Sequence, residues 1–449
     1  MNATIARTST ATAAATDSAQ ALALRAAQLA WLAAAVFVVS AGYGALMPVL
    51  PGWLGSMMPG AGANEISRHV GFFSGVYAAG VLVGALLWGV ISDRGGRGRI
   101  LIIGLIGYVA TLLLMLIPTL TGLWGLYALR GGTGFFVAAV VPVVSALVAE
   151  HTPEDKRARR FAWLSAMSLL GFLSGPGLIQ VADGIGLLAG IGPATAATSA
   201  RTVIVLSAVL GAVMMLGLAR ALPALRAPAA AVPKNSTTGA AGHTVALCWL
   251  SGMVTVALAG FEVGIVLQGQ QHADMSTRRI AMMFAECSLV MLFVNAALFF
   301  TGMLEKVSSR ALIAAGLMLA TAGLAVMAWH SAEDWLYLGI SLTSAGTGLV
   351  LPVIAYLAAG VSHQKLGTTM GALAAASGLG QTLGSSLSGW LFGATAQLSF
   401  GLLMLPLVVM LVFLVLRPGW WSGASAEPSP DPTRPTVGGR KRTLREGSP

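Results

Sequence analysis

Long apolar runs follow one another along almost the whole chain, each bounded by a short stretch that is polar or rich in glycine and proline. A helix that crosses a bilayer needs about 20 mostly apolar residues. Twelve runs come close to that length. They predict spanning helices near residues 28–54, 68–91, 100–118, 123–149, 160–187, 202–221, 245–269, 280–303, 310–329, 335–360, 366–393 and 398–416. The pattern therefore predicts an all-α membrane protein.

The composition agrees with this pattern. Of the 449 residues, 56% are hydrophobic and only 9% are charged, and the mean hydropathy is +0.81. A soluble globular domain carries about 25% charged residues, so the chain is not one. The first apolar run is also much longer than the roughly 7 to 15 residues of a signal peptide, which predicts a retained first helix.

Polar stretches divide the chain into five parts. Residues 1–27 are rich in Ala and Thr and predict a disordered cytoplasmic N-terminus, and residues 418–449 predict a disordered basic cytoplasmic tail. Residues 223–244 hold three prolines among small and polar residues, which is typical of a linker. This linker separates an N-terminal six-helix half, residues 28–222, from a C-terminal half, residues 245–417.

The two halves share short sequence similarities. The stretch "LSAMSLLGFLSG" at 164–175 matches "LAAASGLGQTLG" at 373–384 in six of twelve positions, 209 residues later. The triplet "GTG" at 132–134 recurs at 346–348, 214 residues later. Because nearly the same offset pairs helix 5 with helix 11 and helix 4 with helix 10, we expect an internal duplication, which is common in transporters.

The positions of Lys and Arg predict the orientation. If the N-terminus is cytoplasmic, the termini and cytoplasmic loops carry 21 of the 26 basic residues, as the positive-inside rule requires. One further basic residue, Arg130, falls within a helix, and the external loops carry Arg68, Arg201, Arg278 and Arg279. Topology thereby explains the net charge of +10 better than nucleic-acid binding does.

Four motifs resemble known elements of one family. The loop "GVISDRGGRGRI" at 89–100 resembles the G-x-L-x-D-R-x-G-R-R/K loop of the major facilitator superfamily, and "LRGGTG" at 129–134 resembles its R-x-x-x-G element. "GFLSGPG" at 171–177 is similar to the G-x-x-x-G-P antiporter signature, and "ALMPVLPGWL" at 45–54 is similar to helix 1 of drug exporters. The resemblance covers about residues 28–416.

The resemblance implies a fold and a mechanism. The fold is the major facilitator fold, with twelve transmembrane helices in two pseudo-symmetric six-helix halves that rock about a central site. The protein is then a transporter and not an enzyme, driven by a proton gradient and needing no cofactor. Tetracycline exporters carry an acidic residue in helix 1 where Val39 and Ser40 stand here, so tetracycline is not the expected cargo.

The charged loop after helix 2 resembles the conformational latch of this family. Gly89 would let another helix approach closely. Asp93 would lie at the N-terminal end of helix 11, whose dipole attracts a carboxylate, and Arg94 and Arg97 would bind lipid headgroups or neighbouring carboxylates. Alternatively, these charges only set the topology of the loop. That explanation accounts for the arginines but not for Asp93.

Helix 5 carries the second motif of interest, Gly171, Gly175 and Pro176. Proline removes a backbone donor and bends a helix, and the two glycines permit tight packing against a neighbour. Bending or sealing here would influence the direction of exchange. A purely structural kink is the alternative.

Three ionisable residues fall inside predicted spans: Arg130 in helix 4, Glu262 in helix 7 and Glu286 in helix 8. A charge near the bilayer centre costs about 2.5 to 3.5 kcal/mol by insertion scales, so each needs a reason. Moving a carboxylate out of water favours its protonated form, which would let either Glu carry a proton. Arg130 could hold an anionic substrate or pair with a carboxylate. Structural pairing is the alternative for all three.

Other polar groups give weaker signals. Gln180, Gln268, Asn295 and Gln381 could line a central substrate cavity together with Arg130, or could only bond helices together. Neither the six histidines nor Cys248 and Cys287 have metal-ligand spacing, so no metal site is expected.

These observations favour a secondary active transporter that exports an amphipathic small molecule, drug-like or endogenous, in exchange for protons. A siderophore or another carboxylate metabolite is an alternative cargo, and proton-coupled import of a sugar or organic acid is a second alternative. We expect a monomer surrounded by lipid in the bacterial inner membrane, with both termini cytoplasmic and no nucleic-acid partner. No Walker A or catalytic motif occurs, which argues against an ATP-driven pump or an enzyme.

Overall fold

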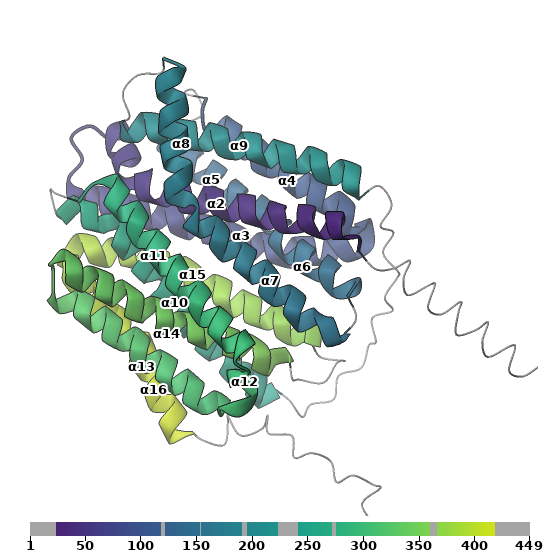
Figure 1. The fold of residues 1–449 in the computed structure, drawn as a ribbon. Coiled ribbons are helices and arrows are strands. Elements are labelled where there is room, and N and C mark those ends of the chain that lie inside the picture. The colour runs from purple at the N-terminus through teal and green to yellow at the C-terminus, as the bar shows by residue number, and fades with distance from the viewer. Residues whose placement is uncertain are drawn as a thin grey trace, which may run out of the picture.

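The computed structural model describes residues 24–117, 122–152, 154–190, 195–222, 241–271, 275–359 and 366–417. Within these ranges the chain is built from helices and contains no strand. Most helices run roughly along one direction and form a bundle (Figure 1). Residues 1–23 of the predicted N-terminus, the whole predicted tail and most of the predicted linker lie outside the described residues.

The N-terminal half contains eight helical segments. They are α2 (Ala26–Met57), α3 (Ala63–Gly95), α4 (Arg97–Leu114), α5 (Leu123–Val137), α6 (Val141–Glu150), α7 (Glu154–Leu173), α8 (Gly175–Leu188) and α9 (Ala196–Ala221). The C-terminal half contains α10 (Ala241–Gln271), α11 (Thr277–Phe300), the short α12 (Met303–Lys306), α13 (Ser309–Trp329), α14 (Glu333–Ala359), α15 (Leu366–Thr395), the 3-10 turn η2 (Ala396–Leu398) and α16 (Ser399–Leu416).

These segments account for twelve spans. Within the described residues, ten stretches are each long and apolar enough to cross a membrane, and α7 with α8 makes an eleventh that is bent. The longest stretch, Gly371–Leu416, holds two helices, α15 and α16, so counting them separately gives twelve. The predicted starts are furthest off at α7 and α9, which each begin six residues earlier than expected. At α7 the charged residues from Glu154 continue the helix beyond the apolar run.

Two spans are interrupted where the sequence places proline. The span predicted as a single helix over 123–149 breaks between α5 and α6, because Pro142 lacks an N–H and the preceding turn tightens. There the amide of Val140 donates to the carbonyl of Val137 at 2.8 Å. The other break lies at Ser174, where α7 and α8 meet at 44°. The bend at Pro176 is therefore confirmed.

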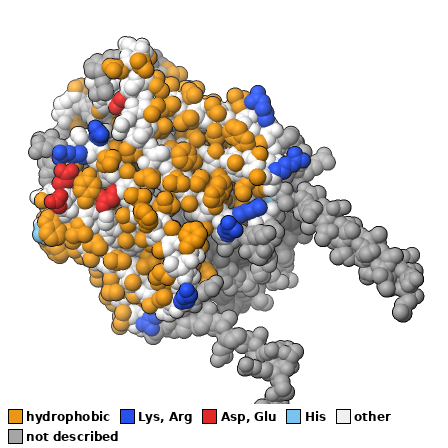
Figure 2. Space-filling view, in the orientation of Figure 1, with side chains coloured by type: hydrophobic (Ala, Val, Ile, Leu, Met, Phe, Trp, Pro, Cys, Tyr) orange, Lys and Arg blue, Asp and Glu red, His pale blue; other side chains and the backbone are white. Residues whose placement is uncertain are grey.

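The surface is banded in the way a membrane protein requires. Figure 2 shows a broad apolar zone with charged side chains confined to its two ends. At the end where α2 begins, the described charged side chains are all basic: Arg25, Arg97, Arg99, Arg159, Arg160, Arg220, Lys306, Arg310 and Arg417. At the opposite end acidic and basic side chains mix: Glu65, Arg68, Asp183, Arg201, Arg278, Arg279, Glu333 and Asp334.

The internal duplication is confirmed by equivalent contacts in the two halves. The hydroxyls of Ser40 and Ser168 join α2 to α7 at 2.9 Å, and those of Ser251 and Ser377 join α10 to α15 at 2.5 Å. Ser377 follows Ser168 by the 209 residues that the sequence comparison gives.

The two "GTG" triplets are also used alike. Gly132 packs against α4 and Gly134 against α3, while their counterparts Gly346 and Gly348 pack against α13 and α11. In each half, therefore, the first glycine of the triplet faces the third span and the second glycine faces the second span.

The halves meet most closely where α3 crosses α15. A Cβ built on Gly71 would lie 2.6 Å from the Cα of Gly389, so no side chain fits between the helices there. Toward the other end of α3 this cover is lost, and five of the six residues from Leu86 to Ile91 are exposed, Trp88 being the exception. The halves are thus in close contact on the side away from Asp93.

Candidate functional site

Arg130 is the largest fully buried side chain in the described part of the protein, with 2% of its surface exposed. Aromatic rings surround its guanidinium: Cζ lies 4.3 Å from the ring centroid of Tyr77, 5.2 Å from that of Phe73 and 5.5 Å from that of Tyr43. Each distance is within the range of a cation–π interaction. Nε and Nη2 find no hydrogen-bond acceptor among the described residues.

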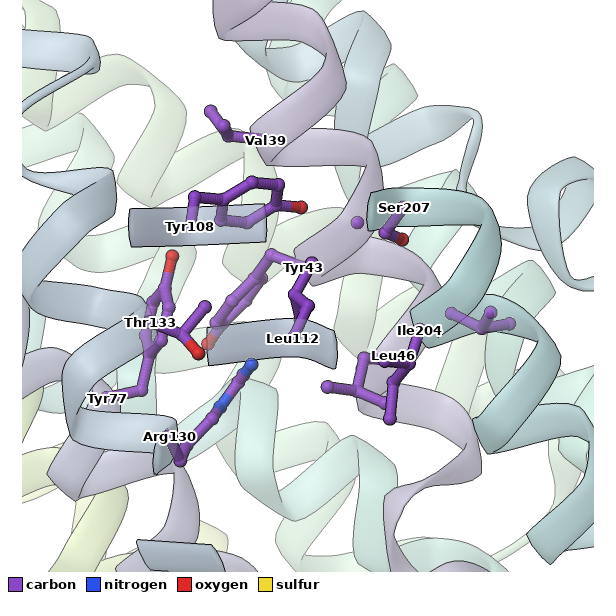
Figure 3. A pocket seen from close by; sticks show the side chains of 12 residues that line it. Val39, Tyr43, Leu46, Tyr77, Tyr108, Leu112, Arg130, Thr133, Ile204 and Ser207 are labelled. Carbon is purple, nitrogen blue, oxygen red and sulfur yellow. The ribbon is translucent and has the colours of Figure 1, made fainter. Parts of the chain in front are cut away.

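A small cavity of about 10 Å³ lies at Arg130, which is about the room that one water molecule needs. The polar part of its lining consists of Arg130, the hydroxyl of Thr133 on the same helix, and hydroxyl groups from four other helices. Apolar side chains make up the rest. Figure 3 shows the guanidinium of Arg130 pointing toward the Tyr43 ring. The cavity is lined by Val39, Gly42, Tyr43, Leu46, Tyr77, Tyr108, Leu112, Arg130, Thr133, Val203, Ile204 and Ser207.

Two glycines fix the position of Tyr43 in the middle of α2. A Cβ on Gly42 would lie 2.5 Å from the hydroxyl oxygen of Tyr108, and a Cβ on Gly44 would lie 2.8 Å from the carbonyl oxygen of Phe172. The sequence Gly-Tyr-Gly therefore lets α2 approach α4 on one side and α7 on the other. The ring of Tyr43 packs against Tyr77 at 5.0 Å and against Phe172 at 5.3 Å.

Glu262 approaches this cluster from the C-terminal half. It is half-buried on α10, and its carboxylate interacts with the hydroxyl of Tyr43. The contact between the halves continues through aromatic rings, because Phe172 also packs against Phe284 of α11 at 6.0 Å. The structure thus brings Glu262 and Arg130 to the same tyrosine, one on each side of the boundary between the halves.

Glu286 lies on α11, within the C-terminal half, and is also half-buried. Its Oε1 accepts a hydrogen bond from the hydroxyl of Ser341 on α14 at 2.5 Å, while Oε2 is buried and finds no donor among the described residues. Cys287, next to it on α11, lies close enough to both Glu262 and Glu286 to interact with each. The thiol of Cys287 thus lies within electrostatic reach of both acids.

Among the described residues, the N-terminal half brings no carboxylate to Arg130. The titratable groups that act on its guanidinium are Tyr77, Tyr43 and Tyr108. The ion pair that the structure shows, between Nη1 of Arg279 and Oε2 of Glu333 at 3.0 Å, is on the exposed surface. Glu262 is the carboxylate that the structure places across Tyr43 from Arg130.

The four predicted amides do not gather at one point. Gln180 on α8 is exposed, and Gln381 on α15 is half-buried. Asn295 donates from Nδ2 to the carbonyl of Met291 on its own helix at 2.8 Å. Gln268 is fully buried, and neither of its amide atoms has a partner among the described residues. Of the predicted cavity residues, Arg130 alone lines the cavity of Figure 3, and the role of the amides in substrate binding stays a prediction.

The predicted latch is only partly described. Asp93 and Arg94 lie in the last turn of α3, but their side chains are outside the described set. No described atom lies within 4 Å of a Cβ built on Gly89, so no helix packs closely against it in this conformation. Arg97 begins α4 and is half-buried. The latch therefore stays a prediction for another conformation of the protein.

The helix 5 motif packs on α2. A Cβ on Gly175 would lie 2.6 Å from the backbone of Gly44, and Gly171 approaches the carbonyl of Phe37 as closely. Pro176 is buried in the first turn of α8. These residues hold α7 and α8 against the segment of α2 that carries Tyr43, and so they support the site without lining it.

The tyrosines were missed by the sequence reasoning. The chain has six tyrosines, and three of them, Tyr43, Tyr77 and Tyr108, converge near Arg130. The signal was their depth: tyrosine in membrane proteins is enriched at the interface with water, and these three lie well inside their spans. A hydroxyl so placed needs a polar partner, which could have directed attention to Arg130 and Glu262.

Comparison with known proteins gives one relative that matches along most of the chain and another that matches along about a third of it. The tetracycline resistance protein of class C from Escherichia coli is 29% identical over 407 residues, covering 88% of this chain and 98% of that protein. The quinolone resistance protein NorA of Staphylococcus aureus is 25% identical over 143 residues, covering 32% of this chain and 35% of that protein.

Solved structures agree on the fold. The human organic anion transporter MFSD10 (TETRAN) superposes with a TM-score of 0.66 at 17% identity, covering 86% of this chain and 99% of that one. A POT family transporter in complex with a thioalcohol-conjugated peptide gives 0.72 at 15% identity, covering 87% and 96%. The sequence pattern of the Major Facilitator Superfamily matches residues 32–299 and 286–446. With twelve spans, a duplicated half and these matches, the chain belongs to the Major Facilitator Superfamily of membrane transporters.

Proposed function

We propose that this transporter exports amphipathic small molecules of the drug type in exchange for protons. The observation that carries the proposal is Glu262, a half-buried carboxylate within the membrane span of α10 that meets Tyr43 at the boundary between the halves. Relatives named for resistance to tetracycline and to quinolones support export of drug-like compounds. Cargo and coupling are the parts of this proposal that need experiment.

Proton coupling follows from the position of Glu262. A carboxylate in a low-dielectric environment favours its protonated form, and contact with water favours release of the proton. Glu262 lies where the two halves meet, so rocking of the halves changes its exposure. Alternating access would then load a proton from one side of the membrane and release it on the other.

The direction of opening follows from the charges. The end of the bundle at which α2 begins is the basic one, which the positive-inside rule places in the cytoplasm of a bacterial inner membrane, with both termini inside. In that orientation the close contact between Gly71 and Gly389 lies on the external side. The structure then represents a conformation closed to the outside, ready to take up cargo from the cytoplasm or the inner leaflet.

A second cargo class is favoured by Arg130. A buried guanidinium without a carboxylate in its own half can attract an anionic group. A siderophore or another metabolite that carries a carboxylate would supply one, provided that the cavity widens in another conformation, because its present volume of about 10 Å³ admits no such group.

Inverted membrane vesicles with an imposed pH gradient test both proposals. Addition of an exchanged cargo dissipates the gradient, which a pH-sensitive dye records. The panel contains tetracycline, a fluoroquinolone, a lipophilic cation and an iron-free catecholate or hydroxamate siderophore. Native protein is compared with Glu262→Gln and with Arg279→Gln, the latter as a surface control.

We expect at least one amphipathic compound of the panel to dissipate the gradient with the native protein and the surface control, and Glu262→Gln to abolish this. A response to the siderophore alone would favour the carboxylate metabolite as cargo. Proton exchange is wrong if no cargo that the protein transports releases protons, and Glu262 is not the carrier if its variant behaves as the native protein does.

A further inference from the structure

We infer that Tyr43 is the positioning residue that connects the buried arginine of the N-terminal half to the carboxylate of the C-terminal half. Its ring receives the guanidinium of Arg130, and its hydroxyl meets Glu262. The functional meaning of this link rests on the proposed proton exchange. The placement of its ring against Arg130, Tyr77 and Phe172 stands on the structure alone.

The first step of the argument is the placement of Tyr43 between two environments. Tyr77 and Tyr108 are buried within the N-terminal half, whereas Tyr43 is only half-buried and reaches the boundary between the halves. Its ring stacks at a tilt on Phe172, which itself packs on Phe284 of α11. Of the three tyrosines, Tyr43 is therefore the one that touches both halves.

The second step is that the backbone holds this ring in place. Gly42 and Gly44 press α2 against Tyr108 on one side and against the backbone of Phe172 on the other. Gly175 closes the same contact from the α8 side. Because α2 packs closely against its neighbours at both glycines, the backbone that carries the ring of Tyr43 is held on both sides.

The third step is the chemistry of the contact. An ionised carboxylate only accepts hydrogen bonds, so the hydroxyl of Tyr43 must donate to it. A protonated carboxyl also offers a donor, so the hydroxyl can accept instead. The protonation state of Glu262 thereby changes the role of the Tyr43 hydroxyl, while the face of the same ring interacts with the cation of Arg130. One side chain thus senses both charges.

Few other titratable groups face Glu262. On α11 the titratable groups near Glu262 are Cys287 and its sequence neighbour Glu286. From α2 it is Tyr43, and α15 and α16 carry no titratable residue in their helical segments. On α3, Tyr77 lies on the Arg130 side of the Tyr43 ring, while on α14 the acids Glu333 and Asp334 lie in the first turn, at the exposed end. A change at Tyr43 should therefore be felt by Glu262 more than a change at any other aromatic residue.

Infrared difference spectroscopy of the full-length protein in lipid, titrated from acidic to alkaline pH, tests this link without a cargo. The carbonyl band of protonated Glu262 is assigned as the band lost in Glu262→Gln. Tyr43→Phe removes only the hydroxyl and keeps the ring. Tyr108→Phe makes the same chemical change at the other side of the cavity and serves as the matched control.

We expect the Glu262 band to move to higher wavenumber in Tyr43→Phe, because a carbonyl that loses a hydrogen bond stretches at higher frequency, and its titration midpoint to change by about half a pH unit or more. Tyr108→Phe should leave both unchanged. An unaltered band in Tyr43→Phe, an equal change in Tyr108→Phe, or no titrating band lost in Glu262→Gln would each overturn the inference. Failure of the proposed exchange is read separately, from vesicles in which no cargo releases protons.

Discussion

The two halves share a scaffold but divide the charges between them. Serine pairs and glycine contacts recur at equivalent positions, with Ser40 and Ser168 matched by Ser251 and Ser377. The position 214 residues after Arg130, however, is Ser344, a buried serine, and no carboxylate of the N-terminal half stands at a position equivalent to Glu262. The cation belongs to one half and the acid to the other.

This difference teaches where coupling can occur. A charge pair contained in one rigid half would keep its geometry as the halves rock, so only its access to water would depend on the conformation. A cation and an acid on opposite halves change their separation and their access to water with every rocking movement. Segregated charges on a symmetric scaffold therefore connect protonation to conformation in a way that symmetric charges could not.

The largest expected effect comes from removing the cation. Arg130→Ala leaves the aromatic cluster and Glu262 in place but takes away the positive charge. We therefore expect gradient-driven transport in vesicles to fall to background, a decrease of at least about a hundredfold. This corresponds to a loss of roughly 3 kcal/mol or more from a buried charged group. Arg130→Lys keeps the charge but not the planar face, and should retain a small fraction. Native-like activity in Arg130→Ala would show that the cation of the N-terminal half plays no part in coupling.

The next prediction moves the acid across the boundary. Val39 is buried on α2 and lines the cavity at Arg130. We expect Glu262→Gln to abolish proton-coupled transport and Val39→Asp in the same chain to restore only part of it, roughly a tenth. A carboxylate then lies near the cation, but within one half only its access to water changes as the halves rock. Proton release on cargo addition measures the recovery.

A control separates this rescue from a general effect of charge. Val36→Asp places the same carboxylate one turn earlier on α2, at a buried residue that does not line the cavity. It should not restore transport. Equal recovery in both variants would show that proximity to Arg130 is irrelevant.

A smaller effect tests the shared scaffold itself. Gly175 and its counterpart Gly384 both pack against backbone, of α2 and α10 respectively. Alanine at either position forces the helices apart, which costs about 1–3 kcal/mol as overpacking does, so both variants should lower the apparent melting temperature in detergent by a similar number of degrees. Gly89→Ala has open space around it and should leave the melting temperature unchanged. Unequal losses at the two equivalent glycines would show that the scaffold is less symmetric than its contacts indicate.

The sequence predicted the scaffold better than the site. Apolar runs of sufficient length leave little freedom in where helices cross, and the glycine triplets reported the duplication because close helix contacts demand glycine at fixed positions. The site depends on which side chains from distant spans face one another. Arg130, Glu262 and Glu286 could be chosen because a charge in a membrane is unusual at any position. Their connection through Tyr43 required the rotation of α2 against α10, which no local pattern specifies.

The smallest expected effect concerns the second acid. Glu286 accepts a hydrogen bond from Ser341 within its own half and does not meet Tyr43 in the structure. If coupling depends on an acid that faces the opposite half, Glu286→Gln should reduce proton-driven transport by less than about threefold, a loss below roughly 1 kcal/mol, since an amide oxygen can still accept from Ser341. Ser341→Ala should have an effect of similar size. A loss as complete as that of Glu262→Gln would mean that the two acids, which share Cys287 as a neighbour, act as one proton site, and that the boundary between the halves is not what distinguishes them.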